Sequence, residues 1–262
     1  MEAGDYLQLT KQSLLNMKNL SSLASSLAAG LLLLAPAVTR AGVLGSPHDF
    51  SQASWNFSNP SDPNSVCGPC HQPHHADSRI IPLWGHTTST GPWIMYNTNT
   101  VPVSHMKAVP SPTPTGPSLA CLSCHDGTVA VNSYGGGIQG GTASYITNSA
   151  KIGTDLTHTH PISFTYDANL VGTGPNQDRW IYNPDTTQVL IPDSPGGFVP
   201  GNDMSINGFL LGGNHRLECS SCHSVHNQQG SPYNPVNNPK LVVINGTKGG
   251  VGSLLCRSCH DK

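Results

Sequence analysis

The chain repeats one short pattern four times, as Cys67-Gly-Pro-Cys70-His71, Cys121-Leu-Ser-Cys124-His125, Cys219-Ser-Ser-Cys222-His223 and Cys256-Arg-Ser-Cys259-His260. These stretches, motifs one to four, contain all eight cysteines of the chain. The spacing C-x-x-C-H is typical of c-type haem attachment, in which two thiols bind the haem vinyl groups and the next histidine binds the iron. We therefore expect four covalently attached haem c groups. The attachment residues are Cys67, Cys70, Cys121, Cys124, Cys219, Cys222, Cys256 and Cys259, and the proximal iron ligands are His71, His125, His223 and His260.

Other uses of the cysteines explain the pattern less well. Eight cysteines in an exported chain could form four disulfide bonds. A C-x-x-C pair can also hold zinc or act as a redox dithiol. None of these uses requires a histidine after every second cysteine, so haem attachment is favoured.

A sixth iron ligand is needed at each haem unless the site is open for chemistry. Only Met95, Met106 and Met204 could supply sulfur after the N-terminal segment, whereas histidines are plentiful. We therefore expect bis-histidine ligation at all four haems. The candidate distal ligands are His48, His74, His160 and His226, with His86 and His215 in reserve, and His75, His105 and His158 as surface or neighbouring residues. Our provisional pairing assigns His48 to haem one, His74 to haem two, His160 to haem three and His226 to haem four.

The N-terminal 41 residues are typical of a secretory signal peptide. Lys18 precedes an apolar stretch at 20–34, and small residues follow, with cleavage expected after Ala41 or Ala37. Met17 is an alternative start, and a retained membrane anchor is the alternative interpretation of the apolar stretch. Export places the protein outside the cell or at its surface, or alternatively in the periplasm. We expect no stable membrane span in the mature chain.

Composition limits the fold and the partners. Charged residues make up 10% of the chain and the formal net charge is −2, which argues against nucleic acid as a partner. A weakly charged surface also does little to keep copies of the chain apart. With 28 glycines and 22 prolines among 262 residues, sustained helices are rare. We expect mostly irregular structure, with short helices around the haem motifs, few short strands at 180–191 and 241–244, and an elongated form organised around a stack of four haems.

A weak internal duplication divides the mature chain into two dihaem modules, 42–150 and 151–262, within one continuous fold. Motifs one and three are each followed by a second histidine, His74 or His226, three residues after the first. Motifs two and four share the pattern L-x-C-x-S-C-H-D. A histidine also precedes each module's first motif, as His48 or His160. Repetition of this kind indicates a repeated structural unit.

On these residues the chain resembles the OmcE-type extracellular tetrahaem cytochromes, whose subunits form nanowires. The resemblance rests on six stretches: His48-Asp-Phe-Ser, Cys70-His-Gln-Pro-His74, Pro82-Leu-Trp-Gly-His86, Cys121-Leu-Ser-Cys-His-Asp-Gly-Thr-Val-Ala130, His160-Pro-Ile-Ser-Phe164 and Cys222-His-Ser-Val-His226. It implies a filament with a continuous haem chain, bis-histidine ligation and an axial histidine shared between subunits, for which His48 is a natural donor. The Pro-rich and Gly-rich inserts depart from the family pattern.

Three functions fit these features. The first is electron transfer as the repeating subunit of an extracellular conducting filament that meets redox partners and an extracellular electron acceptor. The second is a soluble periplasmic tetrahaem electron shuttle. The third is a multihaem oxidoreductase with an open haem site, but no C-x-x-C-K motif occurs and histidines can fill every axial position. We therefore expect an electron-transfer protein rather than an enzyme.

Overall fold

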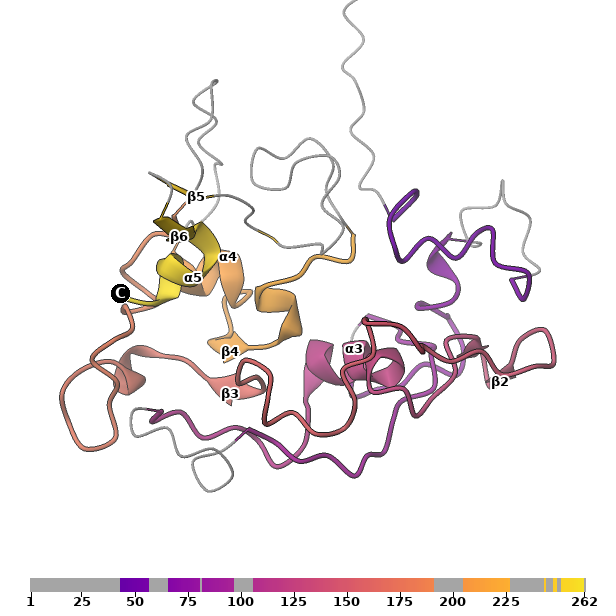
Figure 1. Ribbon diagram of the computed structural model, residues 1–262, viewed down its shortest axis with the longest axis horizontal. Helices are drawn as coiled ribbons and strands as arrows, with labels where there is room; N and C mark the ends of the chain where they lie inside the picture. The colour runs from indigo at the N-terminus through magenta and orange to yellow at the C-terminus, as the bar shows by residue number, and fades with distance from the viewer. Residues whose placement is uncertain are drawn as a thin grey trace, which may run out of the picture. The chain divides into compact units, whose positions relative to one another are not determined.

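Turns and irregular segments connect a few short elements (Figure 1). The computed structural model describes residues 43–56, 66–80, 82–96, 106–190, 205–226, 243, 247–248 and 251–261. Within them the elements are, in chain order, α3 (Gly116–His125), β1 (Ser133–Tyr134), β2 (Gly137–Ile138), β3 (Phe164–Thr165), the 3-10 turn η1 (Ala168–Leu170), α4 (Ile206–Leu210), β4 (Arg216–Leu217), the 3-10 turn η2 (Cys219–Ser221), β5 (Thr247–Lys248), β6 (Val251–Ser253) and α5 (Leu254–Cys259).

Local sequence explains where the helices begin and end. A proline stands in the first turn of α3, where a missing N–H costs nothing, and the helix stops at Asp126 beside Gly127, whose φ is +75°. Ser205 caps α4, because its side chain accepts a hydrogen bond from the Gly208 N–H. The short helices are therefore held by caps and by what they pack against, since isolated helices of this length are not stable in water.

The strands form three separate two-stranded antiparallel sheets, β1–β2, β3–β4 and β5–β6. The strand expected at 180–191 does not form in its described part: Ile181 makes an isolated bridge with His260, and Gln188 makes one with Ser205. Most of the strand expected at 241–244 lies outside the described residues, as does the predicted signal peptide at 1–41.

The buried apolar residues cluster differently in the first half of the described chain, residues 43–156, and in the second half, residues 157–261. In the second half, one cluster of eight buried residues joins Phe164, Tyr166, Val189, Ile206, Leu210, Leu211, Leu217 and Leu254. In the first half the largest groups of buried apolar residues are two clusters of three: Ile80, Leu119 and Ala120, and Met95, Leu122 and Leu156. The second half therefore has a conventional core, which the Gly- and Pro-rich composition had not predicted.

The two halves meet where α3 contacts η2, so that motif two lies beside motif three (Figure 1). The described residues belong to one compact unit. None of the helices found in the described residues has the length and apolar character needed to cross a membrane.

Candidate haem-binding sites

Each motif forms the same tight turn. The backbone N–H of its histidine donates to the carbonyl of its first cysteine in motif one (His71 to Cys67, 2.9 Å), motif three (His223 to Cys219, 3.0 Å) and motif four (His260 to Cys256, 2.9 Å). Motif two forms the last turn of α3. Residues at positions i, i+3 and i+4 of such a turn share one face. Two thiols and an imidazole are therefore presented together, and all eight cysteines are free thiols.

The second cysteine of every motif faces the interior. Burial raises the pKa of Cys70 and Cys222 to about 11 and that of Cys124 and Cys259 to about 12. A buried thiol stays neutral, which suits a side chain enclosed against an apolar group. The four motifs therefore share one environment for this position, although they lie in four different elements or turns.

The shared pattern of motifs two and four corresponds to a shared structure. Ser123 donates to the Leu119 carbonyl at 2.8 Å, and Ser258 donates to the Leu254 carbonyl at 2.9 Å. Both serines and both leucines are buried. The leucine and serine of L-x-C-x-S-C-H-D thus fix the turn from inside. The final aspartates differ: Asp126 is buried, whereas Asp261 is exposed and accepts from the Tyr182 hydroxyl at 3.0 Å.

Three pairs of histidine rings lie close together, one stacked, one tilted and one edge-on, and each pair joins a motif histidine to a histidine from elsewhere in the chain. The ring centres are 5.9 Å apart for His48 and His125, 6.2 Å for His71 and His226, and 6.1 Å for His160 and His260. The His71 and His226 rings are nearly parallel, with 17° between their planes.

The separation in these pairs fits a metal between the rings. Metal–imidazole bonds are about 2 Å long, so two imidazoles on opposite sides of one iron place their ring centres about 6 Å apart. If haem were bound, its iron would need only two ligands from the protein, which one histidine pair could supply. Across the described residues, no three His, Cys, Asp or Glu side chains converge as a metal site built from protein alone.

Hydrogen bonds orient three of these rings as metal ligands are usually oriented. His71 Nδ1 lies 2.8 Å from the Pro82 carbonyl, His125 Nδ1 lies 2.8 Å from the Ala150 carbonyl, and His160 Nδ1 lies 2.8 Å from the Pro161 carbonyl. An Nδ1–H that donates to a carbonyl leaves the Nε2 lone pair available for a metal. These contacts thus fix the tautomer that iron ligation needs.

Burial lowers the pKa of two of the non-motif histidines. The pKa of His48 is lowered to about 4, first by burial and then by the neighbouring His125 and His223. Burial, followed by the charge of His71, also lowers the pKa of His226. A histidine must be neutral to bind a metal, and a lowered pKa favours that form.

Neither reserve candidate pairs with a motif histidine, although His86 Nε2 lies 3.4 Å from Cys124 Sγ of motif two. Both ring nitrogens of buried His86 contact backbone carbonyls, with Nδ1 2.8 Å from Thr87 and Nε2 3.0 Å from Ala130. His215 Nε2 pairs with an oxygen of Asp185 at 2.6 Å. His74, His75 and His158 are exposed, and His105 lies outside the described residues. The structure thus brings three of the four preferred distal candidates to motif histidines.

The pairing differs from our provisional assignment. His48 and His160 lie opposite the second motif histidine of their own modules, His125 and His260, rather than opposite the first. His226 lies opposite His71 of the other module rather than near motif four. The provisional scheme assumed that each following histidine stays within its module, but the chain crosses between modules at this point.

Cysteines of consecutive motifs lie within electrostatic reach of one another. Cys70 contributes to the raised pKa of Cys124, after burial, and Cys121 hydrogen-bonds with Cys219. Cys222 likewise contributes, after burial, to the raised pKa of Cys259. Motif one is thus near motif two, motif two near motif three, and motif three near motif four.

Several buried polar atoms lack a hydrogen-bond partner among the described residues. They are His48 Nδ1, Trp84 Nε1, Trp93 Nε1 and Asp126 Oδ2. Such atoms are rare in folded proteins and call for an explanation. The two indole N–H groups are donors, and haem carries carboxylate groups that accept hydrogen bonds. The donor set around motifs one and two therefore fits a haem group.

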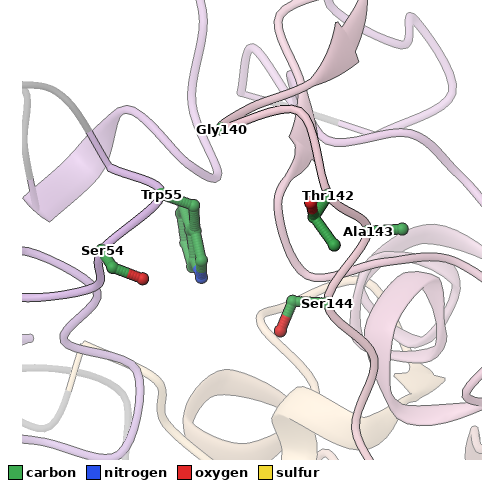
Figure 2. A pocket seen from close by; sticks show the side chains of 6 residues that line it. All are labelled: Ser54, Trp55, Gly140, Thr142, Ala143 and Ser144. Carbon is green, nitrogen blue, oxygen red and sulfur yellow. The ribbon is translucent and has the colours of Figure 1, made fainter.

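A separate cavity of about 390 Å³ is lined by Ser54, Trp55, Gly140, Thr142, Ala143 and Ser144. Figure 2 shows Trp55 on one side and the 142–144 segment on the other. None of its lining residues is a cysteine or histidine of a motif, so we do not assign it to haem binding.

No family model matches the chain, and no curated protein matches it in sequence. The assignment of these sites therefore depends on the motifs and on the geometry of the histidine pairs. Sequence reasoning identified every member of the three pairs but missed the residues that orient or surround them. The Nδ1 acceptors are backbone carbonyls, which carry no sequence signal. From the sequence, Trp84 and Trp93 could be interpreted either as side chains that pack on porphyrin edges or as ordinary core or loop residues.

Proposed function

We propose that the chain is a tetrahaem c-type cytochrome that transfers electrons through bis-histidine haems, as the repeating subunit of an extracellular filament. The observation that carries the proposal is the set of three close histidine pairs with ring centres 5.9 to 6.2 Å apart. Each pair contains one motif histidine, which ordinary aromatic packing does not require. When bound, haem supplies a one-electron ferric/ferrous couple.

The residues of the chain perform three tasks in this proposal. Eight thiols bind the haems covalently, and the turn of each motif presents its histidine on the same face as its cysteines. Backbone carbonyls hold His71, His125 and His160 in the ligating tautomer. Two histidines at each iron leave no open position for a substrate, so the proposal excludes an enzymatic role for these sites.

The internal duplication supports an assignment for motif three. His226 follows motif three by three residues and faces the histidine of motif one. His74 follows motif one by three residues in the same way. The reciprocal arrangement assigns His74 to His223, so that motifs one and three exchange distal ligands.

The surface of the chain supports self-association. The chain carries few charges, and three large apolar side chains among the described residues are more than half exposed: Val109 at 84%, Leu83 at 53% and Ile94 at 51%. Single exposed apolar side chains are common in monomers, so the low charge is the feature that favours association. Consecutive motifs lie near one another within the chain, and a path for electrons through a filament would need such proximity inside each copy.

Intact mass of the exported protein is the first test. We expect a mass that exceeds the polypeptide by four haem groups, together with the absorption spectrum of low-spin iron. A mass equal to that of the polypeptide would refute the proposal.

Single histidine variants test the ligand pairs. His48→Ala, His160→Ala and His226→Ala should each convert one quarter of the low-spin iron to the high-spin form, whereas His158→Ala, at an exposed position, should leave the spectrum unchanged. A fully low-spin spectrum in any of the first three variants would remove that residue from the ligand set. His74→Ala tests the reciprocal assignment in the same way.

Electron microscopy of the secreted material tests the filament. Uniform fibres are the expected result. A monodisperse monomer at high concentration, with four haems bound, would leave a soluble electron shuttle as the function.

A further inference from the structure

Glu218 is a buried carboxylate, with 5% of its surface exposed. It accepts hydrogen bonds from three hydroxyl groups, those of Thr115 at 2.7 Å, Ser118 at 2.5 Å and Ser163 at 2.9 Å. These donors come from the N-terminal end of α3 and from the segment before β3. Burial of a charged side chain costs free energy unless hydrogen bonds or an opposite charge replace its lost hydration.

The direction of these hydrogen bonds is fixed by their neighbours. Ser118 Oγ accepts from the Cys219 N–H at 2.9 Å, and Ser163 Oγ accepts from the Thr115 N–H at 3.1 Å. Backbone N–H groups can only donate, so each hydroxyl has its own proton available for Glu218. The surroundings therefore match an ionised carboxylate, which only accepts hydrogen bonds.

Glu218 lies between motif two and motif three. It directly precedes Cys219, and it holds Ser118 of α3, three residues before Cys121. Its charge contributes to the raised pKa of the Cys121 thiol, where the hydrogen bond with Cys219 and burial come first. It also opposes ionisation of Cys219 itself. One buried charge thus acts on attachment cysteines of two motifs.

Arg216 partly compensates this charge from the solvent side. Its Nε lies 3.5 Å from Glu218 Oε1, and its side chain is 30% exposed against 6% for Glu218. Arg216 Nη2 also donates to Thr115 Oγ1 at 2.9 Å. Because water screens the guanidinium more strongly than the carboxylate, the interior experiences a net negative charge.

From this arrangement we propose that Glu218 is a positioning residue that lowers the redox potentials of the haem sites at motifs two and three. The inference rests on the proposed electron-transfer function. Oxidation removes one electron and adds one positive charge at the site, while Glu218 keeps its proton count and its charge. A fixed negative charge nearby favours the more positive, oxidised form. The redox potentials of the sites at motifs two and three are thereby made lower than they would be without Glu218, while those at motifs one and four are less affected.

Three variants in the full-length, haem-loaded protein test this role. Glu218→Gln keeps the size of the side chain and removes the charge, so two of the four one-electron transitions should shift to more positive potential. Glu218→Asp keeps the charge and should leave the transitions near their original positions. Arg216→Gln removes the compensating positive charge and should shift the same two transitions in the negative direction. Spectroelectrochemical titration measures all three.

Opposite shifts separate charge from structure. If Glu218 served only to join α3 to motif three, then Glu218→Gln and Arg216→Gln would lower stability without shifting potentials in opposite directions, and the proposal would be overturned. Unchanged potentials in Glu218→Gln with four low-spin haems present would overturn it as well. Should Glu218→Gln fail to fold, the Arg216→Gln and Glu218→Asp titrations still decide the matter. Absence of haem from the unaltered protein would instead refute the proposed function.

Discussion

The first half of the described chain, residues 43–156, and the second half, residues 157–261, solve the problem of stability in different ways. The second half encloses a cluster of eight buried apolar residues. The first half contains two separate clusters of three buried apolar residues. It also contains the buried polar atoms that lack partners among the described residues, on His48, Trp84, Trp93 and Asp126.

If the proposed function is correct, this difference means that the two halves depend on haem to different degrees. A cluster of eight side chains supplies apolar contacts regardless of cofactor, whereas small clusters beside unpaired polar atoms leave both burial and hydrogen bonding incomplete. Under the proposed function, haem completes the first half and adds to a core that already exists in the second.

The largest effect is expected when one haem site is removed from either half, because the two halves should then lose stability to different extents. In Cys121→Ala/Cys124→Ala we expect backbone amides throughout residues 43–156 to lose protection from hydrogen exchange. The reason is that the first half would lose a haem that supplies much of its apolar contact. In Cys256→Ala/Cys259→Ala we expect the β3–β4 sheet and α4 to remain protected by their side-chain cluster. Hydrogen–deuterium exchange read by mass spectrometry distinguishes the halves. Equal loss of protection in both variants would contradict the difference.

Truncation of a core leucine measures the side-chain cluster of the second half directly. Leu254 is fully buried, with 0% of its surface exposed, so Leu254→Ala should reduce the free energy of unfolding by about 2–5 kcal/mol. Leu83→Ala provides the control, since Leu83 is 53% exposed and its loss should cost less than about 0.5 kcal/mol. Denaturant titration of the haem-loaded protein gives both values. Similar costs for the two leucines would show that the cluster contributes little.

The two indole N–H groups without a partner among the described residues test whether haem completes the hydrogen bonding of the first half. If haem carboxylates accept from Trp84 and Trp93, then Trp84→Phe and Trp93→Phe should each destabilise the haem-loaded protein by about 1–3 kcal/mol through loss of a hydrogen bond to a charged group. Trp180→Phe is the matched control, because Trp180 is 40% exposed. The same denaturant titration applies, and values equal to that of the control would mean that the indole N–H groups are not used.

The smallest effect concerns the turn at 77–88 in the first half. A side-chain hydrogen bond from Arg79 holds the pKa of Asp77 well below its usual value of 3.8, and Thr88 donates to the same carboxylate at 2.9 Å. Since the folded pKa is depressed, this stabilisation is present above pH 3.8 and is lost as the pH falls below it. In Asp77→Asn, the protection factors of amides in this turn, which are corrected for the intrinsic pH dependence of exchange, should be lower at neutral pH and should no longer fall as the pH drops below about 4. A retained acid dependence would assign it to another group.

Sequence reasoning could predict the parts that depend on local spacing. The C-x-x-C-H turn follows from positions i, i+3 and i+4, and the paired patterns of motifs two and four correspond to the same serine-to-carbonyl hydrogen bond, from Ser123 and from Ser258. The distal candidates His48, His160 and His226 could be selected from nine non-motif histidines because the internal duplication places a histidine before and after the first motif of each module.

The parts that depend on distant contacts could not be predicted. The pairing of His226 with His71 requires motif three to fold back on motif one, which no local pattern encodes. The expected strand at 180–191 instead contributes single bridges, because the Tyr182 N–H donates to the Cys259 carbonyl at the end of α5. The buried cluster of the second half likewise unites residues from Phe164 to Leu254 that show no regular spacing.

The crossing of His226 to His71 has a consequence for how such a chain can evolve. Under the proposed function, a gene segment encoding one duplicated unit could not be expressed alone and still bind its haems as in the whole chain, because one histidine of the His71–His226 pair would be missing. Proteolytic cleavage between the units would then leave two fragments joined by a shared iron as well as by their packing. On this proposal, a longer electron path would be made by adding whole chains rather than single units.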